Sequence, residues 1–329
     1  MDEDDNRCPN CGAPIELSPD TVVLVCGYCG ASVSYVGGTF TPLIVECEDK
    51  GVIRSALERF VGEKARSGVL KDVKYLVVPF WIVELEAVTK YNGYAEETGY
   101  KGKSLYREYR PLRGTIRERV AVAVYGRRFE GIFGLSQVKS ILLSRFEAAQ
   151  PFNPEMVKGW SVIGSELDEV EAIEAAKSRV ADEHRRRVEE MATKVFDCYT
   201  DAEARAARLI LHPVVEARYE SGGKSYRVCM DGARGTARPL VAELPITVRG
   251  RAARAAAAVA SVLAISLAAV VLQQIAFVED LPVEVWLAVT AGPPLLATAA
   301  GAFGAYTATQ EHRVLKSAGE ADVRVLGGL

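Results

Sequence analysis

The run Tyr75-Leu-Val-Val-Pro-Phe-Trp-Ile-Val-Glu-Leu-Glu-Ala87 predicts a strand in the middle of this 329-residue chain. From Trp81 to Ala87 apolar residues alternate with more polar ones, and this period of two is typical of a strand with one buried face. Before the run, apolar residues at helical spacing from Val52 to Val61 predict a helix. The expected unit is therefore a helix followed by strands.

The same order recurs weakly in residues 161–248. Ser165 and Asp168 have the spacing of a capping box, and an apolar stripe from Val170 to Val195 predicts a helix behind it. Alternating residues from Leu209 to Tyr219 then predict a strand that returns through a glycine turn. This pattern favours helices lying on an antiparallel sheet.

Two Cys-x-x-Cys pairs lie near the N-terminus, Cys8-Pro-Asn-Cys11-Gly and Cys26-Gly-Tyr-Cys29-Gly. Four thiolates satisfy a tetrahedral zinc ion, and the glycine after each second cysteine lets the backbone fold back toward sulfur. We therefore predict one structural zinc ion, with iron bound as in a rubredoxin as the alternative. The predicted ligands are Cys8, Cys11, Cys26 and Cys29.

No other pattern predicts chemistry. Four thiolates leave no open coordination position for catalysis, and the three histidines form no zinc-protease motif. Phosphate-binding loops and nucleophile elbows are also missing from the sequence. We expect no catalytic and no cofactor-binding residues, so the chain is not expected to be an enzyme. His184, on an apolar helical stripe, is expected to be structural, and Cys47 is the candidate for a redox-sensing thiol near the ribbon.

Charge limits the partners of the cysteine module. Residues 1–40 hold six acidic residues and only Arg7 as a cation, while the whole chain is nearly balanced, with 40 Lys and Arg against 43 Asp and Glu. Lys and Arg contacts to phosphate dominate nucleic-acid affinity. The module is therefore expected to engage a protein partner, or to dock on the adjacent domain, rather than to bind nucleic acid.

Two uncharged runs near the C-terminus, residues 255–278 and 285–309, predict a transmembrane hairpin. Each exceeds the roughly 20 residues that a helix needs to cross about 30 Å of hydrocarbon. A buried helical hairpin in a soluble protein is the alternative. Small residues recur every fourth position in both runs, which indicates close helix packing and a homo-oligomer built on these helix faces.

Basic residues flank the two runs on their outer sides and are absent from the connector between them. By the positive-inside rule this predicts a two-span protein of the cell membrane with cytoplasmic N- and C-termini, in contact with the lipid bilayer. The flanking basic residues are Arg249, Arg251, Arg254, Arg313 and Lys316.

The predicted fold class is α+β, with a weak internal repeat in a cytosolic core of helices and antiparallel sheet. A zinc ribbon precedes this core and a two-helix transmembrane hairpin follows it. The predicted domains are the ribbon at 1–40, a first α+β unit at 41–160, a second at 161–248 and the membrane hairpin with a short tail at 249–329.

Several segments together carry a family resemblance: the ribbon, Val78-Pro79-Phe80-Trp81, Gln150-Pro-Phe-Asn-Pro-Glu155, the hairpin from Tyr219 to Gly235 and the two uncharged runs. They resemble a group of archaeal and bacterial membrane-anchored zinc-ribbon proteins, often labelled by analogy with the ribbon of transcription factor IIB or of a primosomal helicase. The likeness covers most of the chain. It implies zinc at the four cysteines and no catalytic residues.

An aromatic-rich stretch from Tyr75 to Tyr109 contains interleaved basic residues, such as Arg107. Core aromatics on a sheet explain this mixture most simply. Stacking and charge on single-stranded nucleic acid or contact with lipid headgroups are the alternatives, and the nucleic-acid alternative uses residues 100–119.

The leading functional hypothesis is a membrane-anchored, zinc-binding scaffold or adaptor, without catalysis, that engages a protein partner on the cytosolic face. The first alternative is a nucleic-acid-binding protein at the membrane surface. The second is an iron redox protein of the rubredoxin type.

Overall fold

The computed structural model spans the whole chain, and the account that follows concerns only those residues that it describes. They divide into two units: Met1–Ala242 with Leu315–Leu329, and Glu243–Val314, most of which lies outside the described residues. The described residues are 7–15, 21, 23–34, 42–65, 68–101, 104–128, 131–246, 256, 259–263, 265, 312–316, 319 and 321–328.

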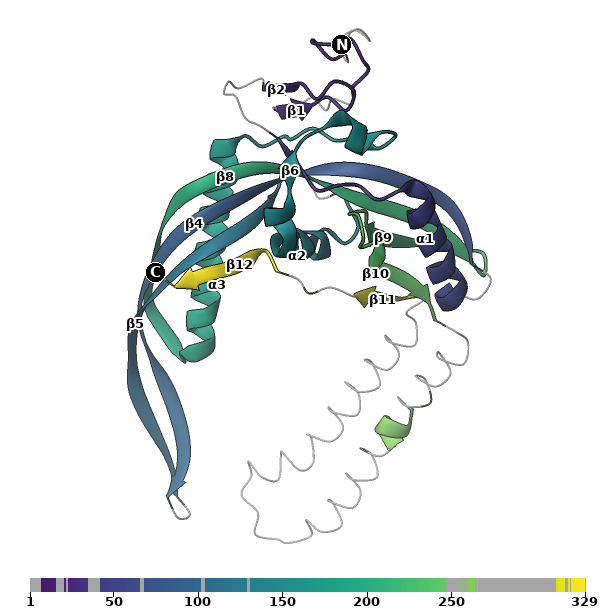
Figure 1. Ribbon diagram of the computed structural model, residues 1–329. Helices are drawn as coiled ribbons and strands as arrows, with labels where there is room; N and C mark the ends of the chain where they lie inside the picture. The colour runs from purple at the N-terminus through teal and green to yellow at the C-terminus, as the bar shows by residue number, and fades with distance from the viewer. Residues whose placement is uncertain are drawn as a thin grey trace. The chain divides into compact units, whose positions relative to one another are not determined.

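Three very long antiparallel strands form the centre of the first unit (Figure 1). The middle strand, β4, pairs with β5 on one side and β8 on the other, and the neighbours in order are β10, β9, β8, β4, β5 and β12. The strands are β4 (Val69–Lys101), β5 (Ser104–Tyr125), β8 (Lys194–Ser221), β9 (Lys224–Asp231), β10 (Arg238–Pro245) and β12 (Val323–Gly328).

Helices and short strands complete the described structure. The helices are α1 (Lys50–Ala65), α2 (Leu135–Arg145), α3 (Glu169–Met191) and the 3-10 turns η2 (Phe146–Ala148) and η3 (Pro154–Val157). The short strands are β1 (Val23–Val25), β2 (Ser32–Ser34), β3 (Leu43–Ile44), β6 (Gln150–Pro151), β7 (Ser161–Val162) and β11 (His312–Lys316).

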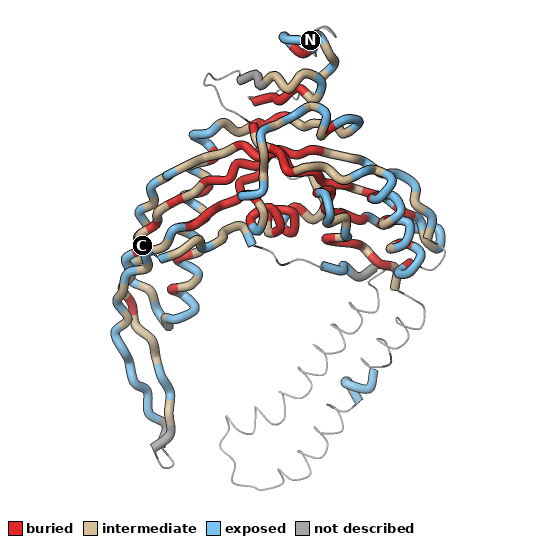
Figure 2. Tube along the Cα trace, viewed as in Figure 1, coloured by how far each residue is buried: buried red, intermediate tan, exposed pale blue. Residues whose placement is uncertain are grey.

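Both faces of the middle of β4 are buried (Figure 2). Phe80 and Ile82 pack in a cluster with residues of α2, whereas Trp81, Val83 and Leu85 pack in a second cluster with residues of α3. Alternate residues of a strand point to opposite faces, so the period of two seen in the sequence divides the core into two layers. The predicted alternation from Trp81 onward is confirmed, and the apolar run before it is buried on both faces, with Val77 in the α3 cluster and Val78 in the α2 cluster.

Pro79 lies inside this central strand, where a residue without an N–H normally breaks a ladder. Its carbonyl accepts a hydrogen bond from the backbone N–H of Gly126, at 2.9 Å, just beyond the end of β5. In an antiparallel ladder the N–H and C=O of one residue point to the same side. The missing donor of Pro79 therefore faces Gly126, whose carbonyl accepts hydrogen bonds from the Glu166 and Leu167 N–H groups instead.

The predicted fold class needs correction. The described fold is a mostly antiparallel β-sheet, in which strands from both predicted α+β units, 41–160 and 161–248, belong to one sheet. β4 continues for 33 residues, far beyond the apolar run that predicted it. The reason is that hydrogen bonding to strands on both sides satisfies its backbone, so polar residues after Ala87 remain in the strand.

No helix in the described part of the chain is long and apolar enough to cross a membrane. This finding corrects the predicted transmembrane hairpin and the predicted two-span localisation in the cell membrane with cytoplasmic termini. An uncharged run meets only the length condition for a span, because a span also needs a continuous helix that satisfies its own backbone. Almost all of runs 255–278 and 285–309, with the small-residue faces expected to oligomerise, lies outside the described residues.

A fully buried carboxylate, Asp231, links β8, β9 and α2. Asp231 at the end of β9 accepts hydrogen bonds from the His212 imidazole at 3.2 Å and the Thr236 hydroxyl at 2.8 Å, and the Arg145 guanidinium of α2 lies 3.6 Å away. Burial raises the pKa of Asp231, but the hydrogen bonds and charge of His212, the Ala233 N–H and Thr236 outweigh it and hold this pKa below its ordinary value.

We predict that Asp231→Ala lowers the free energy of unfolding by about 3–5 kcal/mol at pH 7, because it leaves His212 and Arg145 facing an empty buried site. A carboxyl with a lowered pKa stabilises the fold above its unfolded pKa of about 3.9, and this contribution is lost as the pH falls through the folded value. The difference between wild type and variant should therefore shrink below about pH 4. Denaturant titrations at several pH values measure it, with the exposed Asp201→Ala as the control; equal losses in both variants would contradict the prediction.

Candidate metal centre

The two cysteine pairs fold into the same tight turn. In the first, the Cys8 carbonyl accepts a hydrogen bond from the Gly12 N–H at 2.8 Å, and in the second the Cys26 carbonyl accepts one from Gly30 at 2.9 Å. Gly12 and Gly30 have φ of 72° and 74°, the left-handed region that glycine enters without strain. The glycine after each pair is therefore required by the backbone, as the sequence indicated.

The two turns bring four sulfur atoms together. All four Sγ atoms lie within 4.8 Å of one another, with 3.7 Å between Cys8 and Cys29 and 3.8 Å between Cys11 and Cys26. A disulfide needs about 2.05 Å between sulfurs, and all four cysteines are free thiols. Four ligands at about 2.3 Å from a tetrahedral zinc ion are about 3.8 Å apart, so the cluster has the dimensions of a tetrathiolate metal site and is able to hold a metal ion.

The electrostatics of the four thiols also fit a cation. A hydrogen bond from the Asn10 side chain, at 3.4 Å, holds the pKa of Cys29 at about 6. The Ala13 N–H lowers the pKa of Cys11, but burial and the neighbouring thiols raise it to about 12, and burial raises the pKa of Cys26. Cys29 therefore ionises most easily, whereas ionisation of Cys11 and Cys26 is disfavoured without a metal, and a bound cation would promote it.

The ribbon is attached to the sheet through Val23 and Ser165. The Val23 N–H donates to the Ser165 carbonyl at 3.0 Å, and the Ser165 N–H donates to the Val23 carbonyl at 2.7 Å. The Ser165 hydroxyl donates to the Gly126 carbonyl and accepts from the Trp81 indole N–H, at 3.0 and 3.3 Å. The predicted capping box between Ser165 and Asp168 is wrong, since Asp168 forms that box with Glu171 and Ser165 holds the ribbon instead.

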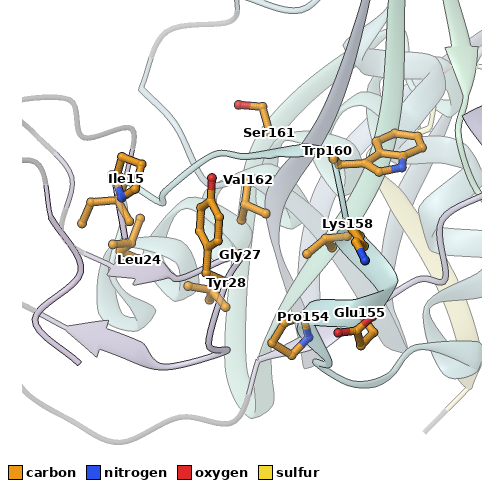
Figure 3. Close-up of a pocket in the computed structure, with 14 residues that line it drawn as sticks. Ile15, Leu24, Gly27, Tyr28, Pro154, Glu155, Lys158, Trp160, Ser161 and Val162 are labelled. Carbon is orange, nitrogen blue, oxygen red and sulfur yellow. The ribbon is translucent and has the colours of Figure 1, made fainter. Parts of the chain in front are cut away.

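A groove of about 550 Å³ runs between the ribbon and the segment from Pro154 to Val162 (Figure 3). Leu24 and Val157 are buried beneath it, while the Tyr28 side chain, from the second cysteine turn, is 68% exposed. The added Cβ of an alanine at Gly27 would lie 3.1 Å from Val162, so the ribbon approaches the segment closely here. The groove therefore depends on a folded ribbon.

Cys47, Cys198, Cys229, His184 and His212 lie outside the four-sulfur cluster. Burial raises the pKa of Cys47 to about 12 and also raises that of Cys229, so neither thiol is activated at neutral pH. His184 is completely buried between α3 and the sheet, where its Nδ1 lies 2.6 Å from the Thr89 hydroxyl. Burial lowers the pKa of His184, which agrees with the structural role predicted for it.

Sequence reasoning missed two parts of the site. Asn10 lies inside the first Cys-x-x-Cys pair, so its side chain was a visible candidate for a sulfur hydrogen bond. The segment from Pro154 to Val162 carries no local signal, because about 130 residues of chain separate it from Tyr28 and only the tertiary structure brings the two together.

Comparisons with protein-family models, curated proteins and solved structures give no match to this chain. The resemblance to membrane-anchored zinc-ribbon proteins therefore stays a prediction. The assignment of the metal site therefore depends on the geometry of the four cysteines alone.

We predict that Cys11→Ser abolishes metal binding, because a serine hydroxyl replaces one of four thiolates and is a far poorer ligand. Cys11 is exposed, so the loss cannot come from a cavity in the core. Metal content after gel filtration, measured by mass spectrometry, should fall from about one ion per chain to near zero. Cys198→Ser, at a half-buried cysteine outside the cluster, should retain the ion. Retention of the ion by both variants would contradict the assignment of Cys11 as a metal ligand.

Proposed function

We propose that this protein is a non-catalytic scaffold or adaptor in which a structural zinc ribbon, attached to a large antiparallel sheet, engages a protein partner. The observation that carries the proposal is the four-sulfur cluster beside a groove that the ribbon itself helps to form. Four thiolates around one ion leave no position for water or substrate. The metal therefore acts by holding the two cysteine turns together.

The groove has the composition of a protein-binding surface. Exposed aromatic side chains above an apolar floor are frequent sources of binding energy, and Tyr28 is placed in this way over Leu24 and Val157. Glu155 and Lys158 supply charged groups among the lining residues (Figure 3), as in the polar rim of a typical interface. A peptide segment with an apolar side chain and flanking charges fits this lining.

Zinc is the metal we propose. Tetrathiolate sites hold either zinc or iron, and zinc matches a site whose role is structural. We predict that the protein purified from its native source contains about one zinc ion per chain and is colourless, because a d¹⁰ ion without redox chemistry gives no visible absorption. Metal analysis together with an absorbance spectrum checks this. Stoichiometric iron with visible absorbance would contradict the zinc assignment and favour a redox function over a scaffold.

We predict that a photo-crosslinking amino acid at position 28 captures one recurrent protein in living cells. The matched control is the same amino acid at Val52, which is 50% exposed on α1 and outside the groove. The adduct should appear at position 28 only, and the additional change Cys11→Ser should remove it, because loss of the metal unfolds the ribbon side of the groove. Absence of an adduct at position 28, or the same adduct at both positions, would refute the proposed partner surface.

A further inference from the structure

The outer parts of β4, β5 and β8 extend beyond α2 and present one open face of the sheet (Figures 1 and 2). Residues directly opposite each other in an antiparallel ladder share a face, so the register identifies which side chains lie there. We name this surface the outer face. It consists of Lys90, Asn92, Tyr94 and Glu96 of β4, Arg107, Tyr109, Pro111 and Arg113 of β5, and Lys194, Phe196, Asp197 and Tyr199 of β8.

Aromatic rings are exposed across the outer face. Tyr94 lies at the centre, with its ring 5.5 Å from that of Tyr109 and 5.8 Å from that of Phe196. Tyr109 and Phe196 are each 57% exposed and Tyr199 is 70% exposed. Sequence analysis favoured core packing for the aromatics of this stretch, and for Tyr109 that interpretation is wrong. An open hollow of about 520 Å³ lies between these rings and Arg113.

Exposed cations lie among the rings. Lys90, Arg113 and Lys194 are exposed, and none of them forms an ion pair with a carboxylate in the part of the chain that the structure describes. Arg113 donates to the neutral Asn92 side chain at 3.0 Å, and the Lys194 ammonium lies 5.9 Å from the centre of the Phe196 ring. These positive charges therefore remain available to an anionic ligand.

The balance of charge on the outer face is positive. It holds four cations, Lys90, Arg107, Arg113 and Lys194, against two carboxylates, Glu96 and Asp197. Glu96 is already occupied by Arg107, at 3.3 Å. The ligand that this surface fits must therefore combine negative charge with flat apolar groups.

We propose that the outer face binds single-stranded nucleic acid, with unpaired bases stacked on the aromatic rings and phosphates held by the unpaired lysines and arginine. Side chains on a sheet can stack on bases only when these are unpaired, so a duplex offers the cations alone. The rows from Lys90 to Glu96 span about 20 Å at roughly 3.4 Å per residue, enough for a few nucleotides. This site is separate from the metal centre and does not depend on its metal.

The test uses the metal-loaded full chain and a fluorescein-labelled oligothymidylate of about 15 nucleotides, a length within the range of known single-strand sites. Fluorescence anisotropy is measured for this strand, for the same strand paired with oligoadenylate, and for competition by phosphatidylcholine vesicles containing phosphatidylserine. The variant Tyr109→Ala/Arg113→Ala removes a ring and a cation from the outer face.

The matched control is Tyr106→Ala/Arg110→Ala. Both control residues are also exposed on β5, but their register with Gly99 and Ala95 places them on the opposite face. Thermal unfolding of both variants must occur at the wild-type temperature, which shows that the sheet is intact. Any difference in binding between the two variants is then caused by the side chains of the outer face and not by unfolding.

We expect the outer-face variant to weaken binding of the single strand about tenfold or more, while the control changes it less than about twofold. Arg113→Ala alone should reduce the slope of log K against log salt by about 0.7, the value for one lost phosphate contact on a single strand. Binding of the duplex should be much weaker than that of the single strand. The metal-free protein should bind the single strand as the loaded protein does.

Three results would overturn the proposal. The first is no binding of the single strand at low salt, and the second is an equal loss in both variants. The third is vesicle binding that the outer-face variant abolishes while oligothymidylate binding does not respond, because the surface would then recognise lipid headgroups. None of these results bears on the metal content or the crosslinking at position 28, so the two proposals fail independently.

Discussion

The continuous antiparallel pairing of β4 with β5 and β8 is the constraint on which the rest of the described structure depends. β4 pairs with β8 from Val69 to Tyr94 and with β5 from Phe80 to Lys101. Because side chains alternate between faces, the register assigns the residues of β4 and β5 to a face. The pairing of β8 with β4 shifts at three bulges, one of them between Asn92 and Gly93. The register places Phe80 under α2 and Trp81 under α3. A shift of β4 by one residue would move each of its side chains to the opposite face. Because both faces are buried, the packing of these side chains fixes the register.

Ser165 connects the metal centre to this sheet by hydrogen bonds. Ser165 pairs with Val23 of the ribbon through its backbone and with Trp81 and Gly126 of the sheet through its hydroxyl. A module of this size buries too little apolar surface to fold on its own, and the four thiols require a cation before all can ionise. The ribbon therefore draws its order from two sources, the proposed metal ion and the buried edge against the sheet.

The same sheet supports two surfaces of different chemistry. Near the ribbon, apolar side chains and Tyr28 form a groove that fits a peptide. On the outer parts of the long strands, exposed rings and cations share one face because residues two apart on β5, such as Tyr109, Pro111 and Arg113, point the same way. The acidic cysteine module and the basic outer face belong to separate parts of the sequence, which explains why the net charge of −3 reveals neither.

The sequence by itself determined the four cysteines of the cluster, the glycines that their turns require and the alternation that starts at Trp81, because each depends on neighbours a few residues away. It also contained the order of a helix followed by strands, which occurs as α1-β4-β5 and as α3-β8-β9. Only the tertiary structure decided how far the strands extend, that Ser165 holds the ribbon rather than capping a helix, and that Tyr109 is exposed. It also overturned the predicted membrane-anchored α+β class, because strands of both predicted units belong to one sheet and no helix among the described residues is long and apolar enough to cross a membrane. These features depend on hydrogen bonds and packing between residues far apart in the chain, which no local pattern records.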